Sequence, residues 1–138
     1  MSYAIETVRK PHYLHLKVTG ENSLQTVRGY LAEIIDICAR NNCMNVLIEE
    51  QLQGARLNTL DVFSAVKSGA SNAGKFPRVI AYVDVNAGSG PGLMHFAESL
   101  SRGRGINVRV FNTVPEAEDW LTSTLAADAD KLSNRERR

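Results

Sequence analysis

A glycine-rich stretch, DVNAGSGPGLMHF at residues 84–96, is the first candidate for chemistry. Glycines let a backbone approach a ligand closely, and N–H groups at a helix start attract anions. The spacing differs from GxGxxG, and no lysine followed by serine or threonine completes a Walker loop. Pro91 removes one N–H donor and suits a first helical turn. We interpret the stretch as a helix-starting turn, with ligand contact as the alternative through Asn86, Gly88, Ser89, Gly90 and Gly92.

Acidic residues near the ends of two predicted strands are a second candidate. Glu49, Glu50 and Asp84 would offer the oxygen ligands that magnesium prefers. Adjacent strand residues point to opposite faces, however, so Glu49 and Glu50 should separate. Solvated strand-end carboxylates are therefore the preferred interpretation, and no metal site is predicted. Glu50 remains a ligand-binding candidate together with Thr59, which is more simply the N-cap or first-turn residue of the next helix.

Nucleophilic catalysis is not predicted. Asp84, Ser89 and His95 would supply triad residue types, but the loop lacks a GxSxG nucleophile elbow. His95 lies off the apolar stripe of its predicted helix and should be a surface residue. His12 and His15 fall on opposite faces of a strand and cannot simply chelate one metal. The sequence thus predicts no catalytic residue, no metal and no cofactor.

Strand and helix patterns alternate along the chain. The order is β-β-α-β-α-β-α-β-α, which predicts a single α/β domain with a mostly parallel sheet of four to five strands. A proline break after Lys10 makes the first strand an antiparallel edge. The predicted strands are 3–9, 12–18, 43–50, 78–85 and 106–111. The first predicted helix spans 24–40, the second begins near 58–59, and the third begins at about Pro91. The fourth begins at a Thr113–Glu116 capping box.

Two consequences of this order are expected. Side-by-side strands joined by right-handed crossovers place every helix on one face of the sheet. The other face, half apolar, is then a candidate homodimer or ligand surface. It carries Tyr13, His15, Lys17, Leu47, Tyr82, Arg109 and Phe111, or the strand residues that alternate with them. The domain should occupy residues 1–126, followed by a charged, flexible tail at 127–138.

Composition narrows the functional classes. The 138 residues carry a net charge of +1, with 43% apolar and 22% charged residues, which gives no global field for nucleic acid. Cys38 and Cys43 match neither a CxxC motif nor a zinc framework, and Cys38 is expected to be a buried thiol. No transmembrane run or leader pattern is visible. We therefore expect a cytoplasmic protein without a membrane segment.

The element order and the ending INVRVFNTVPEAEDWL, residues 106–121, resemble the SpoIIAA-like group of the STAS superfamily. The resemblance covers about Tyr3 to Leu125 and rests on the last strand ending in Phe and the capped helix with Glu-Ala and Trp-Leu. It implies a β/α superhelix beside an added edge strand. Members of the group include regulatory protein-binding modules, and the fold has been likened to the CRAL-TRIO lipid carriers.

One departure from the family limits what the resemblance implies. Anti-sigma-factor antagonists carry an Asp-Ser-small-Gly phosphoacceptor motif, where this chain reads GARLNTLDVF at residues 54–63. Phosphoregulation is therefore not carried over. The predicted function is a non-enzymatic STAS-like regulatory or binding module for a protein partner or a small apolar or anionic ligand. The alternatives are a small enzyme that uses the same sheet edge and a purely structural homodimer subunit.

Overall fold

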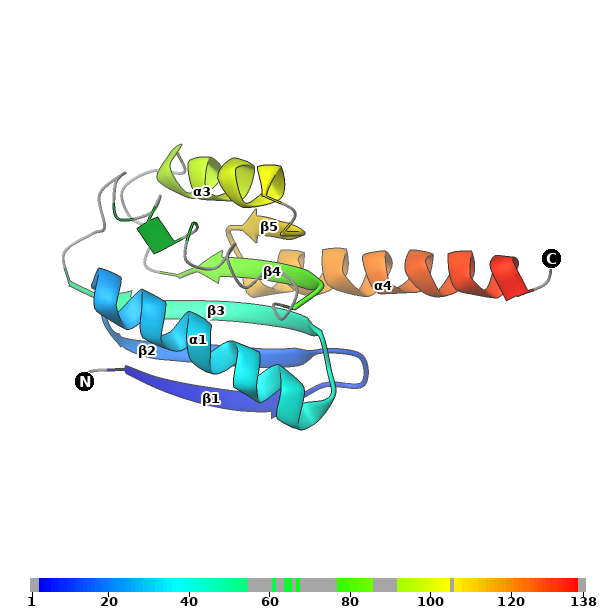
Figure 1. The fold of residues 1–138 in the computed structure, drawn as a ribbon, viewed down its shortest axis with the longest axis horizontal. Coiled ribbons are helices and arrows are strands. Elements are labelled where there is room, and N and C mark those ends of the chain that lie inside the picture. Colours follow the sequence, from blue (N-terminus) through cyan, green and yellow to red (C-terminus); the bar gives the residue numbers. More distant parts are fainter. Residues whose placement is uncertain are drawn as a thin grey trace.

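A computed structural model describes residues 3–54, 61, 64–65, 67, 77–85, 92–104 and 106–136 of the chain. It is a single α/β domain built on one five-stranded sheet whose strands lie side by side in chain order (Figure 1). β1 is antiparallel to β2, and the remaining neighbours are parallel, which confirms the predicted mostly parallel sheet with an antiparallel edge strand. The strands are β1 (Tyr3–Arg9), β2 (Leu14–Glu21), β3 (Asn45–Gln53), β4 (Val79–Asp84) and β5 (Val108–Phe111).

Both faces of the central strands are buried. β3 places Val46 and Ile48 on one face and Leu47 on the other, and all three side chains are at most 2% exposed. Such near-continuous apolar runs are typical of parallel strands that are covered on both sides. The core therefore consists of two layers, one on each face of the sheet.

Helix α1 (Leu24–Asn41) covers one face of the sheet (Figure 1). Ser23 is the N-cap of this helix, because its side chain accepts a hydrogen bond from the Thr26 N–H at 3.1 Å. Asn42 ends the helix in the left-handed conformation, with φ 49°, which asparagine adopts more readily than most residues. The buried side of α1 packs on apolar residues of β2, β3 and β4.

Helix α4 (Val114–Glu136) corrects the prediction that all helices share one face. Its buried residues Ala117 and Leu121 pack against β3 and β4 on the side opposite α1. The handedness rule constrains a helix that connects two parallel strands. Because α4 follows the last strand, it is free to cover the other face. The Thr113–Glu116 capping box is present, with the Glu116 N–H donating to the Thr113 hydroxyl at 3.4 Å.

The sheet face that was expected to be open is therefore largely covered. Tyr13 and Leu47 are buried beneath α4, His15 is 7% exposed, and Tyr82 belongs to the α1 face instead. Trp120 of α4 contacts Phe111, with ring centroids 5.5 Å apart. Homodimerisation stays a prediction, but it has lost the exposed face on which it was based.

Two further segments complete the fold. α3 (Gly92–Gly103) packs beside β5, and α4 continues through the charged segment to Glu136, projecting past the sheet (Figure 1). The flexibility of that segment stays a prediction.

The described residues Asp61, Ser64, Ala65 and Lys67 are helical, in the region of the predicted second helix. None of the helices in the described part of the chain combines the length and apolarity needed to cross a membrane.

Candidate functional site

A cluster of titratable side chains lies at the edge where β3 and β4 end. Glu50 on β3 is paired in register with Asp84 on β4. Tyr82 precedes Asp84 by two residues and so shares its face. Tyr30 reaches the same place from α1. In open α/β sheets this edge, at the carboxyl ends of the parallel strands, is where ligands bind.

Three of these residues, Tyr30, Glu50 and Tyr82, form what we call the Tyr–Glu–Tyr network. The Tyr30 hydroxyl donates a hydrogen bond to Glu50 Oε2, and Tyr82 is also hydrogen-bonded to the Glu50 carboxyl. Glu50 is 6% exposed and Tyr30 1% exposed. A carboxyl group buried this deeply needs hydrogen-bond partners, and the two tyrosines provide them.

Burial sets the protonation of the network. Loss of solvent raises the pKa of Glu50, the hydrogen bonds from Tyr30 and Tyr82 oppose that rise, and the neighbouring Asp84 charge adds to it. The pKa values of both tyrosines lie well above their ordinary value because of burial and because of the Glu50 charge. The tyrosines therefore remain hydrogen-bond donors, while Glu50 retains its proton to a higher pH than an exposed glutamate.

The position of Glu50 follows from the alternation of β3. Val46, Ile48 and Leu52 occupy the α1 face of this strand, and Glu50 occupies the same series. The expectation that Glu50 is a solvated strand-end carboxylate is wrong. Packing of α1 over this face removes water from the carboxyl group, and Tyr30 replaces that water as a partner.

Glu49 points to the opposite face, as the alternation predicted. Its Oε1 lies 2.8 Å from His15 Nε2, and its other oxygen accepts from the Gln51 side chain. The His15 and Glu49 side chains are only 9% and 13% exposed. The sheet therefore separates Glu49 from Glu50 and Asp84, and in the described part of the chain no group of three His, Cys, Asp or Glu is placed to hold a metal ion.

The other predicted ligand-binding residues are only partly described. Gly92 is the first residue of α3, so it lies in a helix start, as the interpretation of a helix-starting turn requires. His95 is exposed, which confirms it as a surface residue, and Cys38 is a buried free thiol whose pKa burial raises to about 11. The remaining candidates lie outside the described residues: Thr59, Asn86, Gly88, Ser89 and Gly90.

The sequence pattern did not indicate Tyr30 as a site residue, and Tyr82 was expected on the opposite face of the sheet. Tyr30 lies between Val27 and Ile34 on the buried stripe of α1. A tyrosine on such a stripe must find a partner for its hydroxyl. That requirement was the available signal, but it does not identify the partner. Only the packing of α1 on β3 assigns Glu50 to this role.

The described strand ends at this edge are acidic. Among the described residues, the C-terminal halves of β2, β3 and β4 contain no lysine or arginine but contain Glu21, Glu49, Glu50 and Asp84. Arg28, near the start of α1, donates its hydrogen bond to Ser64. Hydroxyl and carboxyl groups gathered in this way suit a cationic group or a hydrogen-bond donor.

Comparison with known proteins adds no relative: the chain matches no model of a protein family, and no curated protein matches its sequence.

Proposed function

We propose that this chain is a non-enzymatic, STAS-like binding module that holds a protein partner or a small ligand at the carboxyl edge of its parallel strands. The Tyr–Glu–Tyr network is the observation that carries the proposal. It places a polar, hydrogen-bonded group in the core directly beneath the edge where α/β sheets bind ligands. Tyr82 stays partly exposed, so the network extends from the core towards the surface.

The chemistry of the edge specifies what it would bind. Asp84 and Glu50 are neighbours on one face, and their electrostatic influence raises the cost of bringing an anion close. An ammonium or guanidinium group would instead reduce the repulsion between the two carboxyl groups. We therefore propose a cationic or hydrogen-bond-donating group, such as a lysine or arginine side chain of a partner, for the part of the edge formed by β3 and β4.

A nuclear magnetic resonance titration tests this proposal. The ¹⁵N-labelled protein is titrated with a short lysine- and arginine-containing peptide and, separately, with a glutamate-containing peptide of equal length. We expect the basic peptide to shift the amide signals at residues 49–51 and 84–85, and the acidic peptide to leave them in place. Added salt should weaken the effect, because exposed charges are screened.

Two variants make the titration specific. Asp84→Asn removes one carboxylate from the edge and should weaken binding of the basic peptide. Asp36→Asn removes an equal charge from an exposed position late in α1, at the far end of the sheet, and should leave binding unchanged. Equal loss in both variants, or no shift at residues 49–51 and 84–85 at any peptide concentration, would contradict the proposal.

A second candidate function is general acid–base catalysis at the same edge. The observation that favours it is the raised pKa of Glu50 beside two tyrosine hydroxyls and Asp84. A turnover assay against ester, phosphoester and amide substrate panels distinguishes the two functions. Activity that is lost in Glu50→Gln and retained in Asp36→Asn would favour the enzyme, whereas peptide binding without turnover would favour the binding module.

A further inference from the structure

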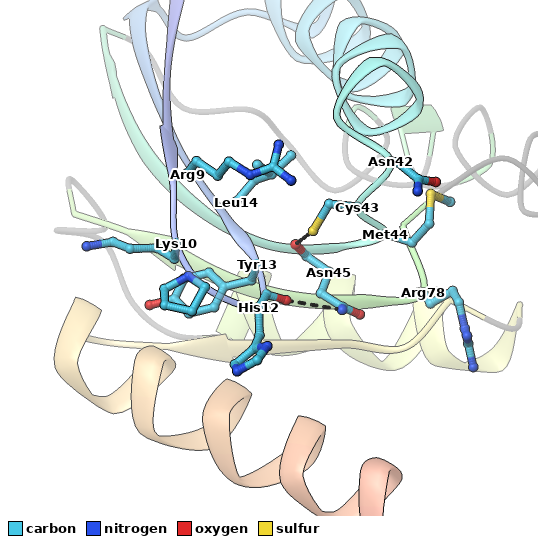
Figure 2. Close-up of a pocket in the computed structure, with 11 residues that line it drawn as sticks. Arg9, Lys10, His12, Tyr13, Leu14, Asn42, Cys43, Met44, Asn45 and Arg78 are labelled. Atoms are coloured by element: carbon cyan, nitrogen blue, oxygen red, sulfur yellow. Dashed lines mark hydrogen bonds between the residues drawn. The ribbon is translucent and has the colours of Figure 1, made fainter. Parts of the chain in front are cut away.

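A second, chemically different pocket lies at the opposite edge of the sheet, where the parallel strands begin. It has a volume of about 350 Å³. Its walls come from the β1–β2 turn, from the connection between α1 and β3, and from the residue that precedes β4 (Figure 2). The proposed function does not use this pocket.

The side chains around the pocket are strongly basic. Arg9, Lys10, His12 and Arg78 line it, and no aspartate or glutamate does. Arg9 donates a hydrogen bond to Asn41 Oδ1 at 3.4 Å, which leaves its charge uncompensated. Within the described residues, none of Arg9, Lys10 and Arg78 forms an ion pair with a carboxylate. Since the whole chain carries a net charge of only +1, this is a local concentration of positive charge.

The framework of the pocket is fixed by hydrogen bonds to backbone carbonyl groups. The Asn45 side chain donates to the His12 carbonyl at 3.3 Å, and the Arg78 N–H donates to the Met44 carbonyl at 2.6 Å. These bonds tie the β1–β2 turn and the start of β4 to the α1–β3 connection. Figure 2 shows Lys10 and Arg78 extending outward from this framework on opposite sides, so both side chains must rotate inward to contact a common anion.

From this arrangement we infer that the pocket binds a small phosphomonoester. Two arginines and a lysine supply the charge and the forked hydrogen-bond donors that a phosphate dianion requires. The pocket is larger than a phosphate group alone and lies at the lower end of the range of small-molecule sites, roughly 300–1,000 Å³. Pro11, Tyr13 and Met44 add apolar wall against which an organic group can pack.

Isothermal titration calorimetry of the full chain with glycerol phosphate, inorganic phosphate and glycerol tests the inference. We expect glycerol phosphate to bind, inorganic phosphate to bind more weakly, and glycerol not to bind. A parallel sedimentation assay with vesicles of phosphatidic acid in phosphatidylcholine distinguishes a lipid headgroup from a free phosphomonoester as the source. Binding to the vesicles together with weak binding of glycerol phosphate would assign the headgroup, while the reverse would assign the free ligand.

Matched variants separate the pocket from general electrostatics. Arg78→Gln should weaken glycerol phosphate binding about tenfold, the usual effect of losing one charge-assisted hydrogen bond. Arg102→Gln removes the same charge from an exposed position that does not line the pocket and should change binding less than about twofold. The inference is overturned if the two variants lose affinity equally. It is also overturned if the protein binds neither glycerol phosphate nor the phosphatidic acid vesicles.

Discussion

The two edges of the sheet carry opposite charge and differ in burial. At the carboxyl edge, Glu50 lies in the core with Tyr30 and Tyr82 as partners. At the amino edge, Arg9 and Arg78 are exposed and surround a pocket without a carboxylate. Glu50 and Tyr30 at the first edge are therefore part of the packing, whereas Arg9 and Arg78 at the second are available to solvent.

This difference in burial predicts different effects of substitution at the buried network and at the exposed pocket arginines. Removing a hydrogen-bond partner of a buried carboxyl group lowers the free energy of unfolding, because the carboxyl group cannot replace that partner with water. An exposed arginine keeps its hydration and contributes little to folding. We therefore expect substitutions in the buried Tyr–Glu–Tyr network to change the free energy of unfolding, and substitutions of the exposed pocket arginines to change ligand affinity with little effect on folding.

Tyr30→Ala should have the largest effect. It opens a cavity beneath α1 and removes a hydrogen bond from Glu50, which predicts a loss of about 3–5 kcal/mol in the free energy of unfolding. Urea unfolding followed by circular dichroism measures this loss. Tyr30→Phe keeps the ring and should cost about 1–3 kcal/mol, through the one hydrogen bond that the buried Glu50 carboxyl loses. A loss below about 1 kcal/mol for Tyr30→Ala would show that the network is not part of the packing.

The pH dependence of stability tests the buried acid. The pKa of Glu50 is raised from 4.5 in the fold, so above pH 4.5 the folded state holds a proton that the unfolded chain has released. Stability should fall as pH rises from 4.5 towards the folded-state pKa, by at most about 1.4 kcal/mol per pH unit for one proton. Urea unfolding across this window measures the slope, and Glu50→Gln should make it shallower. An unchanged slope in Glu50→Gln would contradict the assignment.

Asn42→Ala tests whether this pocket residue at the amino edge contributes to the free energy of unfolding. Asn42 lines the pocket and has φ 49°, a conformation that costs alanine roughly 1 kcal/mol. Thermal unfolding should show that loss, and Asn42→Gly should avoid it, because glycine adopts this conformation freely. If both variants lose equal stability, the Asn42 side chain and not its backbone is responsible.

Arg78→Ala should have the smallest effect on stability. The side chain is exposed, and its backbone N–H bond to Met44 is retained in the variant. We expect a change within about 0.5 kcal/mol by urea unfolding. A much larger loss would mean that Arg78 is a structural residue, and the contrast between the two edges would disappear.

The fold was predictable where local patterns were strong. The second strand, the first long helix and the capping box of α4 are encoded within short segments and agree with the structure. The side of the sheet that α4 covers was not predictable, because no crossover rule applies to a helix after the last strand. Its apolar residues, Ala117 and Leu121, show only that it must pack against something.

For the candidate site, the sequence determined that Glu49 and Glu50 face opposite ways, because the side-chain period of a strand is two. It also determined that Glu50 and Asp84 meet at one edge of a parallel sheet. Only the tertiary structure decided that Glu50 is buried, that Tyr30 is its partner, and that Arg9, Lys10 and Arg78 surround one pocket. Periodicity is a local property, whereas burial and partnership depend on which surfaces meet when distant segments pack together.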